Sequence, residues 1–333
     1  MTTPSTNNNT MTCIEISEPG GPEVLVTAER QVPQAGPGEV LIKVTATGIN
    51  GPDMMQRKGL YPPPKGASDL LGLEVAGTVH ALGDGVINWQ VGDQICGLTN
   101  GGGYAEYCTV DASHCLTVPT GLSLVEAASL PETYFTIWSN IFMTAKLTSG
   151  EVYLVHGGAG GLGTTSIQLG KAFGATVVAT DSPAARCEIC SELGADRVID
   201  YNQEDFVEVV REAYGGADVI LDIVGGPYIE RNIKASKPDG RIAQLAFALG
   251  PKVEINLMPI MLKRLTYTGS TLRSRPASQK TAIAAQLAEK VWPLFDAGQL
   301  KPVVNTTLPL AQAAEAHRLM ETASHTGKIV LTV

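Results

Sequence analysis

Six residues near the middle of the chain have the spacing of a phosphate-binding loop. The segment Gly158-Ala159-Gly160-Gly161-Leu162-Gly163 fits G-x-G-x-x-G, after an apolar run at residues 152–156 and before a helical pattern at residues 162–173. In that context the first glycine allows a tight turn, the second lets backbone N–H groups approach a pyrophosphate, and the third lets the helix pack close to the strand. The positive end of the helix dipole then faces the phosphates. The pattern therefore predicts a dinucleotide site at this loop.

Asp181 is the second chemical feature of that site. A second apolar run, residues 175–180, ends in this carboxylate, at the place where an acidic residue accepts hydrogen bonds from the adenosine ribose. Against NADPH it faces a phosphate that carries about −1.5 to −2 charges, and like charges oppose binding. Arg186 offers that phosphate a cation and Ser182 a donor, so the sequence favours NADH and keeps NADPH as the alternative. An alternative role for Asp181 is the N-cap of a helix that begins at Pro183, which is compatible with ribose binding.

The composition excludes several classes of function. The chain has 333 residues, 44% hydrophobic content and a net charge of −9, which suits about two domains and gives nucleic-acid binding no electrostatic support. No apolar run approaches the ~20 residues of a membrane span. We interpret residues 1–10 as a disordered polar tail without targeting features and the six cysteines as reduced thiols, and we expect a cytoplasmic protein. We interpret Cys187 and Cys190 as two small apolar residues on a helix, with a redox or metal motif as the alternative.

Two kinds of element order divide the chain. Short strands separated by Gly- and Pro-rich turns dominate its first part, which indicates a barrel or sandwich. Strand and helix patterns then alternate, which predicts a doubly wound parallel sheet with right-handed crossovers. A last strand at residues 328–333 is expected to return to the first domain. The predicted class is α/β, with a β-rich domain over residues 11–130 and 275–333 and a Rossmann domain over residues 131–274.

Several segments resemble one known family. Residues 48–77, Ile199–Tyr201, Leu272–Arg275 and Gly327–Val330 are similar to the quinone oxidoreductase branch of the medium-chain dehydrogenase/reductase superfamily. The resemblance implies a GroES-like β-rich catalytic domain, a Rossmann domain and a cleft between them. Gly51 departs from the family pattern, since members commonly carry Arg or another larger residue there, and we expect the adjoining pocket wall to differ in shape and charge.

The residue types at the superfamily's metal positions predict a protein without zinc. Zinc-dependent relatives need a Cys in the first catalytic segment and a His before the Glu of the second. Here the segments read Asn50-Gly51-Pro52-Asp53 and Leu73-Glu74, and no four-cysteine lobe is present. Without a Lewis acid, hydride transfer needs an acceptor that is already electrophilic, such as a quinone or an α,β-unsaturated carbonyl.

The resemblance also implies which residues surround the reacting groups. It assigns Asn50 and Tyr61 to catalysis, with the Tyr61 phenol binding the acceptor oxygen or helping to deliver a proton. The cofactor-contacting residues that it adds to the glycine loop and Asp181 are Asp53, Thr133, Tyr201 and Lys328. Phe247, Ala248, Thr271, Leu272 and Arg273 follow the last two predicted strands of the Rossmann domain, and we expect them at the cofactor because ligands lie outside the carboxyl ends of such strands.

Each of these side chains has a structural alternative. Asn50 and Asp53 can serve turn chemistry, and Tyr61 can pack on the prolines that follow it. Thr133 can be a helix N-cap and Tyr201 a surface aromatic. In the same way, Phe247 can belong to the core and Lys328 can be a solvated lysine at a strand end.

The predicted function is an NAD(P)H-dependent reductase that transfers a hydride to a quinone or enone without zinc. The alternative from another class is a non-catalytic dinucleotide-binding protein with a structural or redox-sensing role. A third interpretation, an enoyl-thioester reductase, needs a basic patch for coenzyme A, for which Arg57, Lys58 and Lys65 are candidates. By resemblance we expect a homodimer joined through edge strands at Arg241–Ala246 and Thr266–Gly269, with no nucleic-acid or membrane partner.

Overall fold

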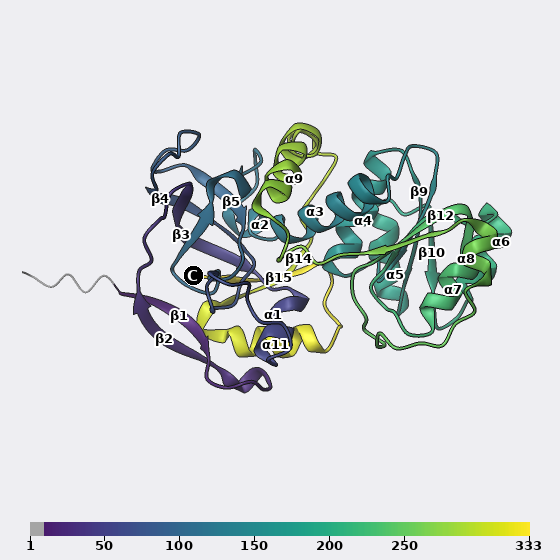
Figure 1. The fold of residues 1–333 in the computed structure, drawn as a ribbon, viewed down its shortest axis with the longest axis horizontal. Coiled ribbons are helices and arrows are strands. Elements are labelled where there is room, and N and C mark those ends of the chain that lie inside the picture. Colours follow the sequence, from purple (N-terminus) through teal and green to yellow (C-terminus); the bar gives the residue numbers. More distant parts are fainter. Residues whose placement is uncertain (1–9) are drawn as a thin grey trace, which may run out of the picture. The chain divides into compact units, whose positions relative to one another are not determined.

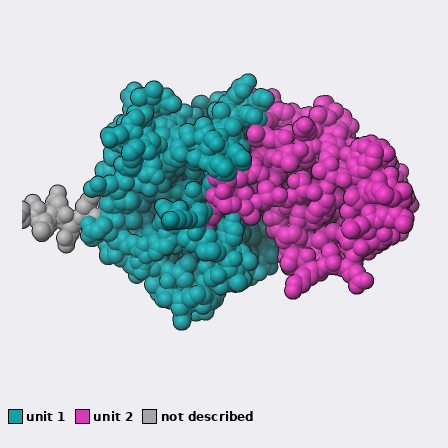
Figure 2. Space-filling view, viewed as in Figure 1, with its two compact units in different colours: residues 1–132, 276–296, 304–333 teal, residues 133–275, 297–303 magenta. Residues whose placement is uncertain are grey.

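The structure, a computed structural model, describes residues 10–333, which divide into two units (Figures 1 and 2). Of the described residues, unit 1 comprises 10–132, Pro276–Asp296 and Val304–Val333, and unit 2 comprises Thr133–Arg275 and Ala297–Val303. Of the predicted tail, residues 1–9 lie outside the described part, and Thr10 already belongs to the first strand.

The segment Ala297–Val303 joins unit 2, although the sequence places it in the β-rich domain. Side-chain to backbone bonds explain this. The Gln168 amide donates to the carbonyl oxygen of Lys301 at 3.0 Å and accepts from its N–H at 2.9 Å. These two bonds tie the segment to the helix that follows the glycine loop.

Unit 2 is built on a six-stranded parallel sheet, as the alternating pattern predicts. Its order is β10-β9-β8-β11-β12-β13. The strands are β8 (Val152–His156), β9 (Thr176–Asp181), β10 (Arg197–Asp200), β11 (Ala217–Asp222), β12 (Ser236–Gln244) and β13 (Thr266–Gly269). Counted along the chain this is the order 3-2-1-4-5-6 of dinucleotide-binding sheets, so the doubly wound prediction is confirmed.

Helices connect these strands (Figure 1). They are α4 (Gly161–Ala172), α5 (Ala184–Glu192), α6 (Phe206–Tyr214), α7 (Tyr228–Ala235) and α8 (Met258–Lys263), and the helix α3 (Pro131–Ile137) and a π-helical segment (Trp138–Thr144) precede β8. Apolar residues of α6 and α7, including Phe206, Val210 and Ile233, pack with Leu154 and Ile220 of the sheet in one buried cluster. Every residue of β8 is buried, which is consistent with the run of apolar residues that precedes His156.

Unit 1 is β-rich. The hairpin β1 (Thr10–Ile16) and β2 (Leu25–Gln31) stands beside a seven-stranded sheet of order β14-β15-β3-β4-β5-β7, with β6 paired to β3. The sheet strands are β3 (Glu39–Gly48), β4 (Glu74–Leu82), β5 (Gln94–Leu98), β6 (Tyr107–Asp111), β7 (Cys115–Thr117), β14 (Val304–Pro309) and β15 (Lys328–Thr332). The helices are α1 (Gly51–Arg57), α2 (Leu124–Ala127), α9 (Ala277–Lys290), α10 (Trp292–Asp296) and α11 (Ala313–Glu321), with short 3-10 turns at Pro22–Val24, Ala112–His114 and Leu310–Gln312.

The last strand returns to the first domain, as predicted. β15 pairs antiparallel with the end of β3, with Val330 opposite Gly48 and Leu331 opposite Thr47. This register brings Lys328 to the segment that begins at Asn50. The pairing therefore joins two parts of the predicted site that are 278 residues apart in the chain.

Two predicted elements differ from the structure. The sequence pattern predicts one helix over residues 277–298, but the structure has two, α9 and α10, because Pro293 has no N–H to continue the first one. β12 was expected at a sheet edge, but it lies between β11 and β13. Of the two strands predicted to form a dimer contact, β13 alone is an edge of the six-stranded sheet.

Candidate active site

The glycine loop joins β8 to α4 in unit 2. A tight turn is expected at Gly158, and the residue with a left-handed conformation is the one before it, Gly157, where φ is +71°. Gly158 is required for packing instead, because a Cβ there would lie 2.7 Å from the Cys190 sulfur and 3.0 Å from the Ala179 Cβ. The loop therefore lies close against β9 and α5.

The start of α4 has room for an anion. A Cβ at Gly163 would lie 2.1 Å from the carbonyl oxygen of Gly157, so this glycine permits the close helix–strand packing expected of it. A Cβ at Gly160 would meet only that same oxygen, at 3.4 Å. The N–H groups of Gly161 and Leu162, in the first turn of α4, have no earlier helical carbonyl to bind. These features fit a pyrophosphate held by backbone donors.

Asp181 ends β9, and its carboxylate is turned toward the loop. It accepts from the N–H of Ala159 at 2.7 Å, from the N–H of Ser182 at 2.8 Å and from Nε of Arg186 at 2.7 Å. Its side chain is 4% exposed and that of Arg186 15%, so the ion pair is largely shielded from water. The N-cap alternative for Asp181 is wrong, because Pro183 occupies that position of α5.

The neighbouring strand adds the remaining residues at this end of the sheet. Asp200 of β10 lies in register with Asp181, and the N–H of Tyr201 donates to the Asp181 carbonyl at 3.3 Å. The Ser182 hydroxyl accepts from the Asn202 amide at 2.7 Å. Tyr201 is 45% exposed, which suits both a ligand wall and the surface aromatic of the alternative.

The other predicted residues of unit 2 follow the last two strands or lie in α3. Phe247 and Ala248 come after β12, and Phe247 is 45% exposed, so its core alternative is wrong. The segment Thr271-Leu272-Arg273 follows β13, with Leu272 and Arg273 buried. Thr133 is buried inside α3 rather than at its N-cap, and its hydroxyl accepts from Thr165 at 3.1 Å.

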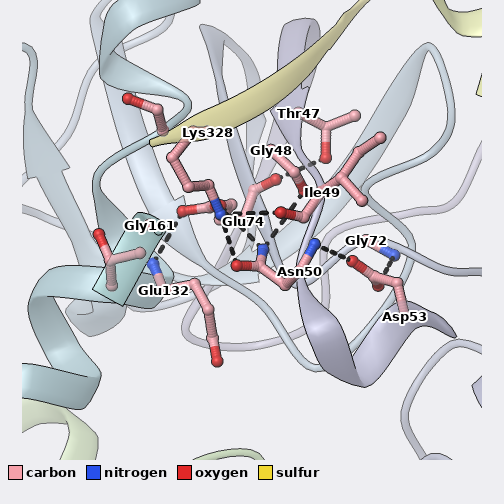
Figure 3. A network of polar contacts seen from close by, with 12 residues as sticks. Thr47, Gly48, Ile49, Asn50, Asp53, Gly72, Glu74, Glu132, Gly161 and Lys328 are labelled. Carbon is pink, nitrogen blue, oxygen red and sulfur yellow. Dashed lines mark hydrogen bonds and ion pairs between the residues drawn. The ribbon is translucent and has the colours of Figure 1, made fainter. Parts of the chain in front are cut away.

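Unit 1 holds a second group of site residues around Asn50 (Figure 3). The Asn50 amide nitrogen donates to Glu74 Oε1 at 2.9 Å, and its oxygen accepts from the Lys328 ammonium. Lys328 also pairs with Glu74 Oε1 at 2.7 Å and donates to the Ile49 carbonyl at 2.9 Å. Because Lys328 is buried, the alternative of a solvated lysine is wrong.

Buried carboxyl groups dominate the electrostatics of this cluster. The second oxygen of Glu74 accepts from the backbone N–H of Glu132 at 2.8 Å. Burial, with Glu74 as a like-charged neighbour, raises the pKa of Glu132 to about 8. Burial also raises the pKa of Asp53 to about 6, against the opposing effect of two backbone N–H donors. Burial therefore raises the pKa of two carboxyl groups near the ion pair of Glu74 and Lys328, and Glu132 is the one that remains largely protonated at neutral pH.

Asp53 supports the loop around Asn50. Its carboxylate accepts from the N–H of Asn50 at 2.8 Å and from the N–H of Gly72 at 3.0 Å, and it closes the first turn of α1. The side chain is buried, so this placement assigns Asp53 to holding the loop rather than to meeting a ligand directly. Tyr61 lies half-buried in the loop after α1.

Sequence reasoning missed the role of two acids. Glu74 was weighed only as part of a metal motif, although a charged residue inside the apolar run Leu70–Val75 is a signal for a buried, paired group. Glu132 gives no such signal, because Glu is ordinary in the first turn of a helix.

The described residues 10–333 contain no group of three or more His, Cys, Asp or Glu side chains that could hold a metal ion. His114 and Cys115, which are adjacent in the sequence, have other partners: the His114 ring bonds the Ala277 carbonyl at 3.1 Å, and the buried Cys115 thiol lies 3.5 Å from the Asp111 carbonyl oxygen. Burial raises the pKa of the Cys187 thiol and raises that of Cys190 to about 12, which disfavours the redox alternative. In the same part of the chain, no helix is long and apolar enough to cross a membrane.

Comparisons with known proteins agree with this architecture. Residues 36–120 match the alcohol dehydrogenase GroES-like domain, and residues 193–331 match the zinc-binding dehydrogenase family. The chain is 30% identical to a mouse (Mus musculus) quinone oxidoreductase, over 98% of this chain and 99% of that protein. It is 31% identical, over 96% of its length, to a mycocerosic acid synthase-like polyketide synthase of Mycobacterium tuberculosis, of which it spans 15%.

One solved structure is similar over nearly the whole chain. The quinone oxidoreductase of Escherichia coli, complexed with NADPH, superposes with a TM-score of 0.85 at 27% identity, covering 97% of this chain and all of that one.

Proposed function

The chain belongs to the quinone oxidoreductase branch of the medium-chain dehydrogenase/reductase superfamily, and from this premise we propose that it is an NAD(P)H-dependent reductase. It transfers a hydride to a quinone or to an activated α,β-unsaturated carbonyl, without zinc. The observation that carries the proposal is the glycine loop, which lies at the centre of a sheet of order 3-2-1-4-5-6. The close packing of Gly163 against Gly157 and the hydrogen bond from the Ala159 N–H to Asp181 support a dinucleotide-binding conformation of this loop.

The residues present fit a nicotinamide dinucleotide. When bound, this cofactor supplies the hydride, and the protein orients it. The first N–H groups of α4 would hold the pyrophosphate, and Asp181 with Ser182 would hold the ribose, beside the exposed ring of Tyr201. We propose that the nicotinamide end is held by Thr133, Phe247, Ala248, Thr271, Leu272 and Arg273. Asp181 favours NADH, with NADPH as the alternative.

Asn50 and Tyr61 are the proposed catalytic residues. Glu74 accepts from the nitrogen of the Asn50 amide and Lys328 donates to its oxygen, and the two residues pair with each other. This fixed orientation supports a role for Asn50 in orienting the acceptor. A phenol such as Tyr61 can bind the acceptor oxygen and deliver the proton that must follow the hydride. Asn50 and Leu73 stand where zinc relatives carry Cys and His, and neither side chain is a zinc ligand of that kind.

We also propose a homodimer that forms at β13. The outer edge of β13 has no partner strand among residues 10–333, and an open edge favours pairing. Four large apolar side chains in and next to α8 are mostly exposed: Leu257, Met258, Met261 and Leu262. All six cysteines are free, which supports a reducing, cytoplasmic location.

The test is oxidation of NADH and NADPH against a panel of quinones and enones, before and after exhaustive chelation. We expect turnover that survives chelation and no stoichiometric zinc by elemental analysis. Cofactor binding without turnover of any acceptor would instead identify a non-catalytic binding protein. A metal bound once per chain, with activity lost on its removal, would show that the zinc-independent mechanism is wrong.

A further inference from the structure

A buried chain of polar groups in unit 1 leads from α11 to the loop at Asn50, and the proposed function does not use it. Arg57, Tyr104 and His317 are all fully buried. Nη1 of Arg57 lies 3.0 Å from Nδ1 of His317, and Nε2 of His317 lies 3.0 Å from the Tyr104 hydroxyl. That hydroxyl lies 3.4 Å from Oδ2 of Asp53.

The donor in each of these bonds is determined by the first one. A guanidinium has donors and no acceptor, so Nδ1 of His317 must accept. Burial, with Arg57 as the next largest cause, lowers the pKa of His317 to about 3, so the ring is neutral and carries its proton on Nε2. Nε2 therefore donates to the Tyr104 oxygen, and the Tyr104 O–H is left to donate to Asp53.

The chain of donors ends at the backbone of Asn50. Asp53 Oδ2, which receives the Tyr104 hydroxyl, also accepts from the Asn50 N–H at 2.8 Å. The Asn50 side chain in turn holds Glu74 and Lys328 (Figure 3). Asp53 thus accepts from the Tyr104 hydroxyl and from the N–H groups of Asn50 and Gly72, and it anchors the segment that carries Asn50.

At its other end the chain is anchored near the surface. Arg57 donates to the Gly20 carbonyl at 3.0 Å and pairs with Glu321 of α11, whose side chain is 30% exposed. Lys58 joins the same carboxylate at 2.9 Å. Buried ion pairs often contribute no more stability than apolar residues of equal volume, and a network of this kind can instead fix the orientation of the groups that it joins.

We propose that His317 and Tyr104 are positioning residues of the reductase, which hold Asn50 in place by supplying Asp53 with an oriented hydroxyl donor. This inference rests on the proposed function, in which Asn50 orients the acceptor. It assigns no contact with substrate or cofactor to either residue.

The decisive variant is Tyr104→Phe, which removes one hydroxyl and keeps the ring. We expect kcat to fall about tenfold with the KM for dinucleotide unchanged. Because ionised Asp53 loses a donor, the acid limb of kcat/KM should move to higher pH. The other groups that face Asp53, namely Lys328, Glu74, Glu132 and the N–H groups of Asn50 and Gly72, are the same in both proteins.

Two substitutions of His317 test the order of donors and acceptors in this hydrogen-bonded network. His317→Gln keeps an acceptor for Arg57 and a donor for Tyr104, whereas His317→Leu keeps neither. We expect the Leu variant to lose at least as much kcat as Tyr104→Phe, and the Gln variant to recover most of it. Tyr153→Phe is the matched control, because it removes the hydroxyl of another buried tyrosine, which lies beside Ser166 in unit 2 and outside this network, and we expect wild-type kinetics.

Asn50→Ala distinguishes a failure of the positioning role from a failure of the proposed function. If Asn50→Ala is impaired while Tyr104→Phe and His317→Leu keep the wild-type kcat and acid limb, the positioning inference is wrong and the proposed function stands. A lower melting temperature without a change in kcat or acid limb would also overturn the inference, because it would show a purely structural role. If the wild-type protein reduces no acceptor, the proposed function itself fails.

Discussion

The substitution Asp181→Ala should change the choice of cofactor, and the structure explains why. In the wild-type protein Asp181 is paired with Arg186 through Nε at 2.7 Å and Nη2 at 3.3 Å. A 2′-phosphate on the ribose would meet a carboxylate and a guanidinium that is already engaged. Removing the carboxylate removes a like charge and also frees Arg186 to bind the phosphate.

The expected change in cofactor preference follows from the charges. Two unit charges about 6 Å apart interact with about 2.8 kcal/mol at an effective dielectric constant of about 20. Arg186 already offsets part of this repulsion in the wild-type protein, so we expect about 1.4 to 2.8 kcal/mol, which is a tenfold to hundredfold change. The ratio of kcat/KM for NADPH to that for NADH should rise by this factor.

The assay compares that ratio in four proteins. Wild type should prefer NADH, and Asp181→Ala should shift toward NADPH. Asp181→Asn, which retains an acceptor for the Ala159 N–H, controls for a loosened glycine loop, because a loosened loop would raise KM for both cofactors alike. The double substitution of Asp181 and Arg186 to Ala should lose most of the gain. A wild-type preference for NADPH, or a ratio that Asp181→Ala leaves unchanged, would refute the reasoning.

Three further predictions concern the acceptor site, the pH dependence and the assembly. Asn50→Ala or Tyr61→Phe should lower turnover by roughly 100-fold with dinucleotide affinity nearly intact, as measured by kcat and by cofactor fluorescence titration, and wild-type turnover would reduce both residues to packing and turn roles. Turnover should fall as the pH drops through about 6. Protonated Asp53 presents an O–H to one of the two backbone N–H groups from which the ionised carboxylate accepts a hydrogen bond, and two donors then face each other. Because the pKa of Asp53 is raised in the folded state, its contribution to the free energy of unfolding is present below about pH 4 and is lost as the pH rises to about 6. The loss amounts to about 3 kcal/mol. Chemical denaturation of wild type and Asp53→Asn across that pH range should show this difference, and parallel pH profiles would contradict it. Light scattering at micromolar concentration should give a dimer, and Met261→Asp on the exposed face of α8 should give a monomer that keeps its cofactor affinity, whereas a monomeric wild type would exclude the β13 contact.

Local sequence patterns were sufficient for the architecture. Alternating strand and helix signals over residues 152–269 predict a parallel sheet because each signal depends on side chains only a few positions apart. The same holds for the glycine loop and for Asp181 at the end of β9. The tight turn is expected at Gly158 and the left-handed residue is Gly157, a difference within the one or two residues by which the boundaries of helices and strands vary.

The orientation of the charged groups was decided by the tertiary structure. Asn50 and Lys328 are 278 residues apart and meet only because β15 pairs with β3, and Arg57 and His317, 260 apart, meet only because α11 packs in unit 1. The spacing of Asn50 and Asp53 is a local signal for the bond to the Asn50 N–H, but nothing local shows that the same carboxylate also accepts from Gly72. Burial and long-range pairing decide which atoms of a side chain remain free, and both depend on segments that are distant in the chain. The sequence therefore determined which chemistry is present, while the folded chain determined where each carboxylate points and what it binds.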